Sequence, residues 1–369
     1  MRRALCLALA LLTLLFGGCA KTEAPEAETE SAGCMELRYA EHFSVESFAG
    51  GAARLRIAEQ DVLLLPADAP VPKGLEALPR IAVPAEKIYL ASSSVPDLFL
   101  QMDALGAVAY TSTAYESWNI PEMREALDAE RIRYVGKYSA PDYELLLREG
   151  CGLVIENSMI LHSPATKEKL EALGLPVLVE YSSYEPHPLG RVEWIKLYGL
   201  LCGRLPEAER WFERQVELFR SLEGAEPSGK TVAFFHISPA GGVTVRRRAD
   251  YITRMIELAG GQTAVTELPE ADSALSTETI QMESFYAQAR DADLLIYNST
   301  AVGEVPDMER FLALHPLLAD FKAVREGNVW CTEKSMFQRS SAAAELIGEL
   351  RVLLSGEAGD SLHYFYRVQ

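Results

Sequence analysis

Several patterns that mark enzymes and metal-binding proteins are missing from this sequence of 369 residues. Its six cysteines include no C-x-x-C pair and its six histidines no H-x-x-x-H pair, which argues against a zinc ribbon, a thioredoxin-like site and a dedicated zinc site. A Gly-x-Ser-x-Gly nucleophile elbow is absent, and so is a G-x-G-x-x-G loop after the first predicted strand. We therefore predict a protein that is not an enzyme and has no metal site or cofactor of its own.

Basic residues are scarce as well. The chain has 35 Lys and Arg and 53 Asp and Glu, which gives a net charge of −18. Nucleic acid is excluded as a partner because binding to phosphates needs a basic face. The same charge disfavours adsorption on an anionic membrane surface. Hydrophobic residues make up 49% of the chain, which is a globular composition, and the length is comfortable for two lobes.

The N-terminus has the build of a secretory signal. Two arginines precede an apolar run at residues 4–16 that is too short to cross a bilayer, and Gly17-Gly18-Cys19 follows. This pattern resembles a bacterial lipobox, which predicts a signal peptide at 1–18 and a lipid on Cys19, although Phe16 stands where leucine is usual. The alternative is an ordinary secretory leader. Residues 19–33 contain no aromatic side chain and are predicted to be a flexible tether.

From Cys34 onward, β-rich runs alternate with helical patterns, which predicts βαβ units and largely parallel sheets. The predicted strands of the first half are 57–65, 87–91, 108–111, 152–155 and 176–180, and its helices are 98–105, 121–129, 142–149 and 166–173. The second half has predicted strands at 231–237, 293–298 and 328–331, and predicted helices at 251–258, 282–289, 312–321 and 342–354.

A helical stretch lies between the two halves. Pro206 suits the first position of a helix, and apolar residues recur at helical spacing as far as Leu222. We expect a stiff strut of about 25 Å there, at 1.5 Å per residue. The predicted division is an N-terminal α/β lobe at 34–190, linking helices at 191–224 and a C-terminal α/β lobe at 225–369.

Three segments, 136–144, 182–195 and 328–331, together with this order of lobes and helices, resemble the class III solute-binding proteins of ABC importers. The resemblance implies two Rossmann-like lobes with central, mostly parallel sheets joined by a long α-helix. It implies a monomer, anchored outside the cell membrane only through its lipid, that captures an iron–siderophore-type chelate and delivers it to an ABC permease and its ATPase. It also implies that Glu144 and Glu283 dock on the permease, whereas without it they are ordinary first-turn acids.

Ligands of open parallel sheets bind beyond the carboxyl ends of the strands. Loops at these positions predict a ligand site made of Trp118, Tyr138, Asn157, Tyr181, Tyr184, Arg246, Arg248 and Lys334. Arginines suit an anionic ferric chelate because their planar forks bind oxygen anions. In an extended strand, Arg246 and Arg248 would share one face, and the alternative is a solvated basic turn paired with Asp250.

Other interpretations remain open at this level. Haem or cobalamin would fit the same fold, and Met159 or His162 can ligate haem iron. A surface-anchored two-lobe metalloenzyme or hydrolase, or an adhesin without a small ligand, belongs to a different class. The scattered cysteines favour buried free thiols over a disulfide framework, without settling the redox state of Cys34, Cys151, Cys202 and Cys331.

Overall fold

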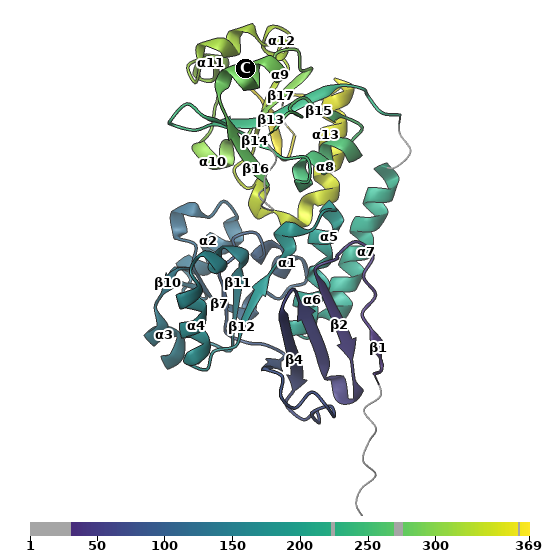
Figure 1. Cartoon of the computed structure of the whole chain (residues 1–369), viewed down its shortest axis with the longest axis vertical. Coiled ribbons are helices and arrows are strands. Elements are labelled where there is room, and N and C mark those ends of the chain that lie inside the picture. Colours follow the sequence, from purple (N-terminus) through teal and green to yellow (C-terminus); the bar gives the residue numbers. More distant parts are fainter. Residues whose placement is uncertain (1–30, 223–225, 269–275, 361) are drawn as a thin grey trace, which may run out of the picture.

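A computed structural model describes residues 31–222, 226–268, 276–360 and 362–369. It has two α/β lobes stacked along the long axis of the molecule, with helix α7 (Leu205–Leu222) running beside them (Figure 1). The predicted signal peptide and Cys19 lie outside the described residues, as does the predicted tether up to residue 30. Within the described part of the chain, no helix is both long and apolar enough to span a membrane.

An N-terminal five-stranded sheet forms one end of the first lobe. Strands β1 to β4 are antiparallel neighbours, and β5 pairs parallel to β4. The strands are β1 (Gly33–Cys34), β2 (Phe43–Ser47), β3 (Ala53–Ile57), β4 (Gln60–Pro66) and β5 (Arg80–Val83). Phe43 packs against Trp194 with ring centroids 4.9 Å apart, which fixes this sheet to the linking helices.

The predicted single strand at 57–65 is wrong. The chain reverses at Ala58 and Glu59, so that Ile57 and Gln60 become partners in an antiparallel hairpin. Ala58 has a φ of 47°, the left-handed conformation that tight hairpin turns use. The apolar residues before and after the turn therefore belong to two strands.

A second sheet in the first lobe is entirely parallel, in the order β12-β11-β6-β7-β8. Its strands are β6 (Ile88–Leu90), β7 (Val108–Thr111), β8 (Arg133–Tyr134), β11 (Leu153–Asn157) and β12 (Val177–Glu180). Its helices are α1 (Pro96–Gln101), α2 (Pro121–Asp128), α3 (Tyr143–Arg148) and α4 (Pro164–Ala172). A small hairpin, β9 (Gly136–Lys137) and β10 (Ala140–Pro141), precedes α3. This is the predicted βαβ arrangement.

Three helices link the lobes: α5 (Pro188–Glu193), α6 (Ile195–Leu201) and the 18-residue α7. At 1.5 Å per residue, α7 is about 27 Å long, close to the predicted strut. Its buried face carries Ala208, Trp211, Phe212, Gln215, Val216 and Phe219.

The C-terminal lobe contains a mixed seven-stranded sheet in the order β16-β14-β13-β17-β18-β19, with β15 beside β13. Strands β13, β17 and β18 are parallel. The strands are β13 (Thr231–Ile237), β14 (Val243–Arg246), β15 (Gln262–Thr263), β16 (Thr277–Ile280), β17 (Leu294–Tyr297), β18 (Val329–Thr332) and β19 (Phe365–Arg367). The helices are α8 (Tyr251–Leu258), α9 (Met282–Ala289), α10 (Ser299–Val302), α11 (Met308–Leu312), α12 (Lys322–Arg325) and α13 (Ala343–Ser355).

The predicted helix at 312–321 is wrong. Helix α11 ends at Leu312, and a separate 3₁₀ turn, Pro316–Asp320, follows. His315 between them is extended, with a φ of −164°, because the proline that follows disfavours the helical conformation.

One apolar core runs through both lobes. It includes Leu98 of the first lobe, Phe219 of the strut and Ile347 of the second lobe, all buried. Packed interiors resist deformation. The lobes are therefore joined by this shared core as well as by the linking helices. All four cysteines of the described chain are free, as predicted, but Cys34 is exposed.

Candidate ligand-binding cleft

The loops that follow β7 in the first lobe and β18 in the second lobe meet at the junction of the lobes. After β18 the chain forms a 3₁₀ turn, η7 (Met336–Gln338), that reaches across to the first lobe. The Gln338 side chain donates to the Ser117 carbonyl oxygen and accepts from the Asn119 N–H, each at 2.8 Å. Both partners follow β7. The loops that border the cleft thus come from the strand ends where such sheets bind ligands.

A second set of contacts closes one end of this cleft. Arg339 pairs with Asp97 at 3.2 Å and with Glu122 at 3.3 Å. The Ser341 N–H donates to the other Asp97 oxygen at 2.8 Å, and the Asp97 side chain is fully buried. We call Asp97, Arg339 and Ser341 the interlobe latch.

Arg246 lies in an aromatic setting at the lobe junction. Its guanidinium carbon is 4.8 Å from the Phe337 ring centroid and 5.5 Å from that of Phe234. It also pairs with Asp250 at 3.4 Å. Burial raises the pKa of Asp250, while the Arg246 charge opposes that rise. The Arg246 guanidinium is thus held by two aromatic rings and one carboxylate.

The extended strand predicted for the arginine run is wrong. Strand β14 ends at Arg246, and the Asp250 N–H closes a turn on the Arg247 carbonyl oxygen at 3.0 Å. Asp250 also caps α8 by accepting from the Ile252 N–H, so the chain has to turn before it. Arg248 is exposed and does not share a strand face with Arg246.

Arg191 of α5 lies near Arg246 at the lobe junction, since the charges of both arginines act on Asp250. Its guanidinium carbon lies 3.8 Å from the centroid of the Tyr251 ring, at the start of α8. Burial raises the pKa of Glu180 in the first lobe, and the Arg191 charge acts against this rise. Two cations therefore lie near one another at the lobe junction, one from the linking helices and one from the second lobe.

Several loops carry exposed apolar side chains, of which the sequence predicts only Met159 and Tyr184 near the ligand. They follow strands of both lobes, and in folded proteins such exposed groups often mark binding surfaces. They are Tyr115 (40% exposed), Met159 (49%), Leu161 (51%), Tyr184 (40%) and Val302 (38%). In the sequence, the feature that could have marked these side chains as site residues is that each of them follows a strand.

Of the predicted tyrosines, Tyr181 and Tyr184 lie together, with ring centroids 5.6 Å apart. Tyr138 is half-buried and packs against the smaller core of the first lobe. The Tyr181 and Tyr184 pair is the part of the predicted aromatic wall that the structure assembles.

Trp118 does not belong to a ligand surface. Its side chain has no exposed area, and its Nε1–H donates to the Thr113 carbonyl oxygen at 3.1 Å. The Trp118 side chain packs its own loop against the core. The prediction that Trp118 contacts the ligand is therefore wrong.

Asn157 and Lys334 already have local partners. The Asn157 side chain accepts from the Met159 N–H at 2.9 Å and shapes the loop after β11. Lys334 pairs with Glu304 at 3.0 Å, and both remain about half exposed. Lys334 follows β18 and its exposed ammonium group can still contact a ligand. The Asn157 side chain instead stabilises the loop after β11.

The two glutamates predicted to dock on a permease are both exposed. Glu144 is in the first turn of α3, whose N-cap Asp142 bonds to Val135 just beyond β8. Glu283 is in the first turn of α9, directly after β16, which runs in the same direction as β13. Each carboxylate thus lies in the first turn of a helix that begins just beyond a strand of its lobe.

Residues 224–231 read G-x-x-x-x-G-K-T, the spacing of a nucleotide-binding P-loop, so an expectation that the chain lacks a Walker-type Gly-Lys-Ser/Thr is wrong. A P-loop leads into a helix whose N-terminus faces the phosphates. Here Thr231 begins strand β13, and the Thr231 N–H bonds to Asp293 at 2.8 Å. The motif match is therefore not a phosphate site.

One fully buried acid lies beneath the rim of the first lobe. Glu156 in β11 has no exposed area, and among the described residues neither carboxylate oxygen has a hydrogen-bond partner. Burial raises the pKa of Glu156 to about 8. The group is neutral at pH 7.

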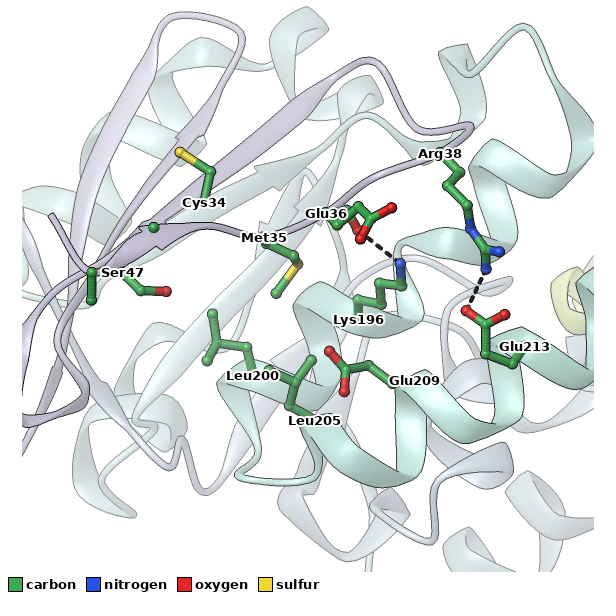
Figure 2. Close-up of a pocket in the computed structure, with 12 residues that line it drawn as sticks. Cys34, Met35, Glu36, Arg38, Ser47, Lys196, Leu200, Leu205, Glu209 and Glu213 are labelled. Carbon is green, nitrogen blue, oxygen red and sulfur yellow. Dashed lines mark hydrogen bonds and ion pairs between the residues drawn. The ribbon is translucent and has the colours of Figure 1, made fainter.

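A cavity of about 520 Å³ lies away from the cleft, between the N-terminal strand and helices α6 and α7 (Figure 2). Lys196 points into it and bonds to the Glu36 carbonyl oxygen at 2.9 Å, while Arg38 pairs with Glu213 at 2.5 Å. Lys196 and Arg38 thus already have partners around this cavity. Across the described residues, no cluster of three or more His, Cys, Asp or Glu is arranged to hold a metal.

Known proteins resemble this chain over most of its length. Residues 92–335 match the family described as periplasmic binding protein. The uncharacterized lipoprotein MJ0878 of Methanocaldococcus jannaschii is 24% identical over 329 residues, or 84% of this chain and 76% of that protein. A periplasmic binding protein from Veillonella parvula is 16% identical, with a TM-score of 0.60 over 85% of this chain and 98% of that one. The periplasmic heme binding protein HutB of Vibrio cholerae is 17% identical, with a TM-score of 0.59 over 73% and 98%.

The chain belongs to the periplasmic binding protein family, and its fold is the class III form of two lobes joined by a helix. It is a solute-binding protein and not an enzyme, as the sequence predicts. What it binds is cargo rather than a cofactor.

Proposed function

We propose that this protein is anchored outside the cell membrane and captures an anionic chelate of the iron–siderophore type between its lobes. The observation that carries the proposal is the pair of arginines, Arg191 and Arg246, at the lobe junction in a chain of net charge −18. Exposed Met159, Tyr184 and Val302 on the rims supply apolar surface above them.

This chemistry suits a chelate with an oxygen-rich, charged centre and an organic periphery. Guanidinium groups bind oxygen anions through a planar donor fork. Ligand pockets combine mostly apolar walls with a few placed polar groups. Lys334, exposed on the opposite rim, adds a mobile cation that can leave Glu304 for the ligand. Arg248 lies outside this group.

Delivery to an ABC permease and its ATPase completes the proposal. Glu144 and Glu283, exposed on the rims of the two lobes, would meet arginines of the permease. The shared core and the strut limit closure, so that the permease would recognise a small change in lobe position. A ligand shifts such an equilibrium only as far as it prefers the closed state.

We further propose the predicted chain organisation. A signal peptide at 1–18 would be removed, Cys19 would carry the lipid, and the tether would end near residue 33, where β1 begins. The lobes would be 34–190 and 225–369, with linking helices at 191–224. The mature protein would act as a monomer on the outer side of the membrane.

Haem is the second candidate ligand, and a specific observation favours it. The Met159 side chain is 49% exposed on the rim, and a thioether can ligate haem iron axially. Haem propionates would also accept hydrogen bonds from the arginines. Cobalamin offers Arg246 a single anionic group, its phosphodiester, in place of two carboxylates.

The test compares ligands of different charge. A ferric tris-catecholate, a neutral ferric trihydroxamate, haemin and cyanocobalamin would be titrated into the protein by calorimetry. We expect the tris-catecholate to bind tightest and Arg246→Gln to weaken it by about tenfold or more. Arg254→Gln, which removes an exposed arginine of α8, is the control and should change nothing. Tightest binding of the neutral chelate would contradict the proposal.

A further inference from the structure

A second cavity, of about 470 Å³, lies where α1, α7 and α13 meet. Its lining comes from all three parts of the protein: Asp97 from the first lobe, Gln215 from the strut, and Glu345 from the second lobe. It shares no residue with Arg191, Arg246 or the apolar rims of the cleft. Its volume is in the range of small-molecule sites.

Gln215 is the group in this cavity that lacks a partner. Its side chain belongs to a residue only 7% exposed, and no donor among the described residues reaches its Oε1 atom. Its amide group interacts instead with the Glu345 carboxylate. An orphaned buried acceptor is costly unless a ligand or water satisfies it.

The cavity carries a surplus of negative charge. Three carboxylates line it, those of Asp97, Glu345 and Glu349, against the guanidinium of Arg339. That guanidinium is already engaged with Asp97 in the interlobe latch and with Glu122. Burial first, and then the Asp97 charge, raise the pKa of Glu345.

The remaining lining consists of Gln101, Ser341, His363 and two large aromatic side chains. Trp211 and Tyr364, each only 7% exposed, both border the cavity. Aromatic side chains combined with carboxylates are the groups that hold organic ammonium ions. A metal ion fits less well, because the described residues include no cluster of three His, Cys, Asp or Glu arranged to hold one.

We propose that this cavity is a second ligand site, separate from the cleft, for a primary alkylammonium ion. The ammonium group donates to Gln215 Oε1 and to the Glu345 carboxylate, and its alkyl chain lies against Trp211. Because the lining comes from both lobes and the strut, the bound ion also holds the two lobes in one relative position.

The test is a calorimetric titration of the protein with n-butylammonium chloride, with sodium chloride at equal ionic strength as the blank. We expect saturable one-to-one binding and a change in tryptophan emission, since the other three tryptophans are at most 1% exposed. Tetramethylammonium chloride has no N–H group and should bind at least about tenfold more weakly. Equal binding of the two ions, or no saturable binding, would overturn the proposal.

Two variants and one control locate the site. Gln215→Leu removes the orphaned acceptor at similar volume, and Glu345→Gln removes a carboxylate; each should weaken n-butylammonium binding by about tenfold or more. Glu217→Gln changes an exposed acid of the same helix and should bind as the parent does. If Gln215→Leu fails to fold, the Glu345→Gln variant alone tests the site. Unchanged binding of n-butylammonium by Glu345→Gln would refute the proposed site. Chelate binding in the cleft uses other probes, so either proposal can fail alone.

Discussion

Arg339 of the second lobe and Asp97 of the first form a salt bridge with 3.2 Å between Nη1 and Oδ1, and the Asp97 carboxylate is completely buried. This pair is the charged element of the interlobe latch. Since the cleft is open to solvent on its rims, the latch holds the lobes together at one end without any ligand present.

Removing the guanidinium should therefore cost more than removing the carboxylate. Arg339→Ala leaves Asp97 buried without its cation and should lower the free energy of unfolding by about 3 kcal/mol. Asp97→Asn keeps a hydrogen-bond acceptor for the Ser341 N–H and leaves Arg339 paired with Glu122, so the loss should be smaller. Urea denaturation of both variants measures this order, and a larger loss in Asp97→Asn would contradict it.

Glu156 should make the stability of the protein depend on pH. Its pKa is about 8 in the fold, against an ordinary value of 4.5, so the folded protein holds a proton that the unfolded chain has lost. Stability is therefore greatest below about pH 4.5 for this group, falls as pH rises, and levels off above about pH 8. Glu156→Gln cannot ionise and should remove this component.

The measurement is the difference in unfolding free energy between Glu156→Gln and the parent at pH 5, 7 and 9. It should grow with pH in favour of the variant, by a few kcal/mol in total. A difference that stays constant over this range would show that Glu156 does not titrate in it.

Glu193 should be essential for attaching the N-terminal sheet. Its buried carboxylate accepts from the N–H groups of Arg38, Tyr39 and Ala40 at 2.8 to 3.1 Å, and from Lys196 at 2.7 Å. Glu193→Ala leaves these donors unsatisfied and should cost about 3 kcal/mol or more.

Amide hydrogen exchange gives the more specific readout. In Glu193→Ala, residues 38–47 should exchange faster while α9 is unchanged. The control is Glu213→Gln, which breaks an exposed ion pair with Arg38 and should cost under about 1 kcal/mol. Equal protection of residues 38–47 in Glu193→Ala and the parent would refute this role.

Charge reversal tests the proposed docking surface. The double variant Glu144→Lys and Glu283→Lys should abolish uptake in cells while the affinity for ligand in solution stays the same, because both side chains are exposed and remote from the arginines. Glu168→Lys and Glu326→Lys, exposed acids outside the first turns of their helices, should transport normally. Uptake that survives the first pair would exclude it as a docking site.

Much of the fold could be predicted because its strands and helices are local patterns. The runs that became β7, β11 and α7 are continuous and apolar or amphipathic, and their boundaries hold within a few residues. The errors lie where a short turn decides the structure. A two-residue turn at Ala58 divides one apolar run, and Pro316 divides one helical run.

The site was harder to predict because position after a strand does not tell which way a side chain points. Trp118 and Tyr184 both follow strands, but the loop of Trp118 folds back on the core while Tyr184 stays exposed. Arg191 belongs to a linking helix, and only tertiary packing brings it to Tyr251. The orphaned Gln215 has no signal in the sequence.

The identity of the ligand that the protein retains after gentle purification from its native host tests the proposed function most directly. Native mass spectrometry combined with metal analysis should detect one anionic chelate per chain, with one equivalent of iron, and Arg246→Gln should retain less of it. A retained ligand that is neutral or free of iron would contradict the account.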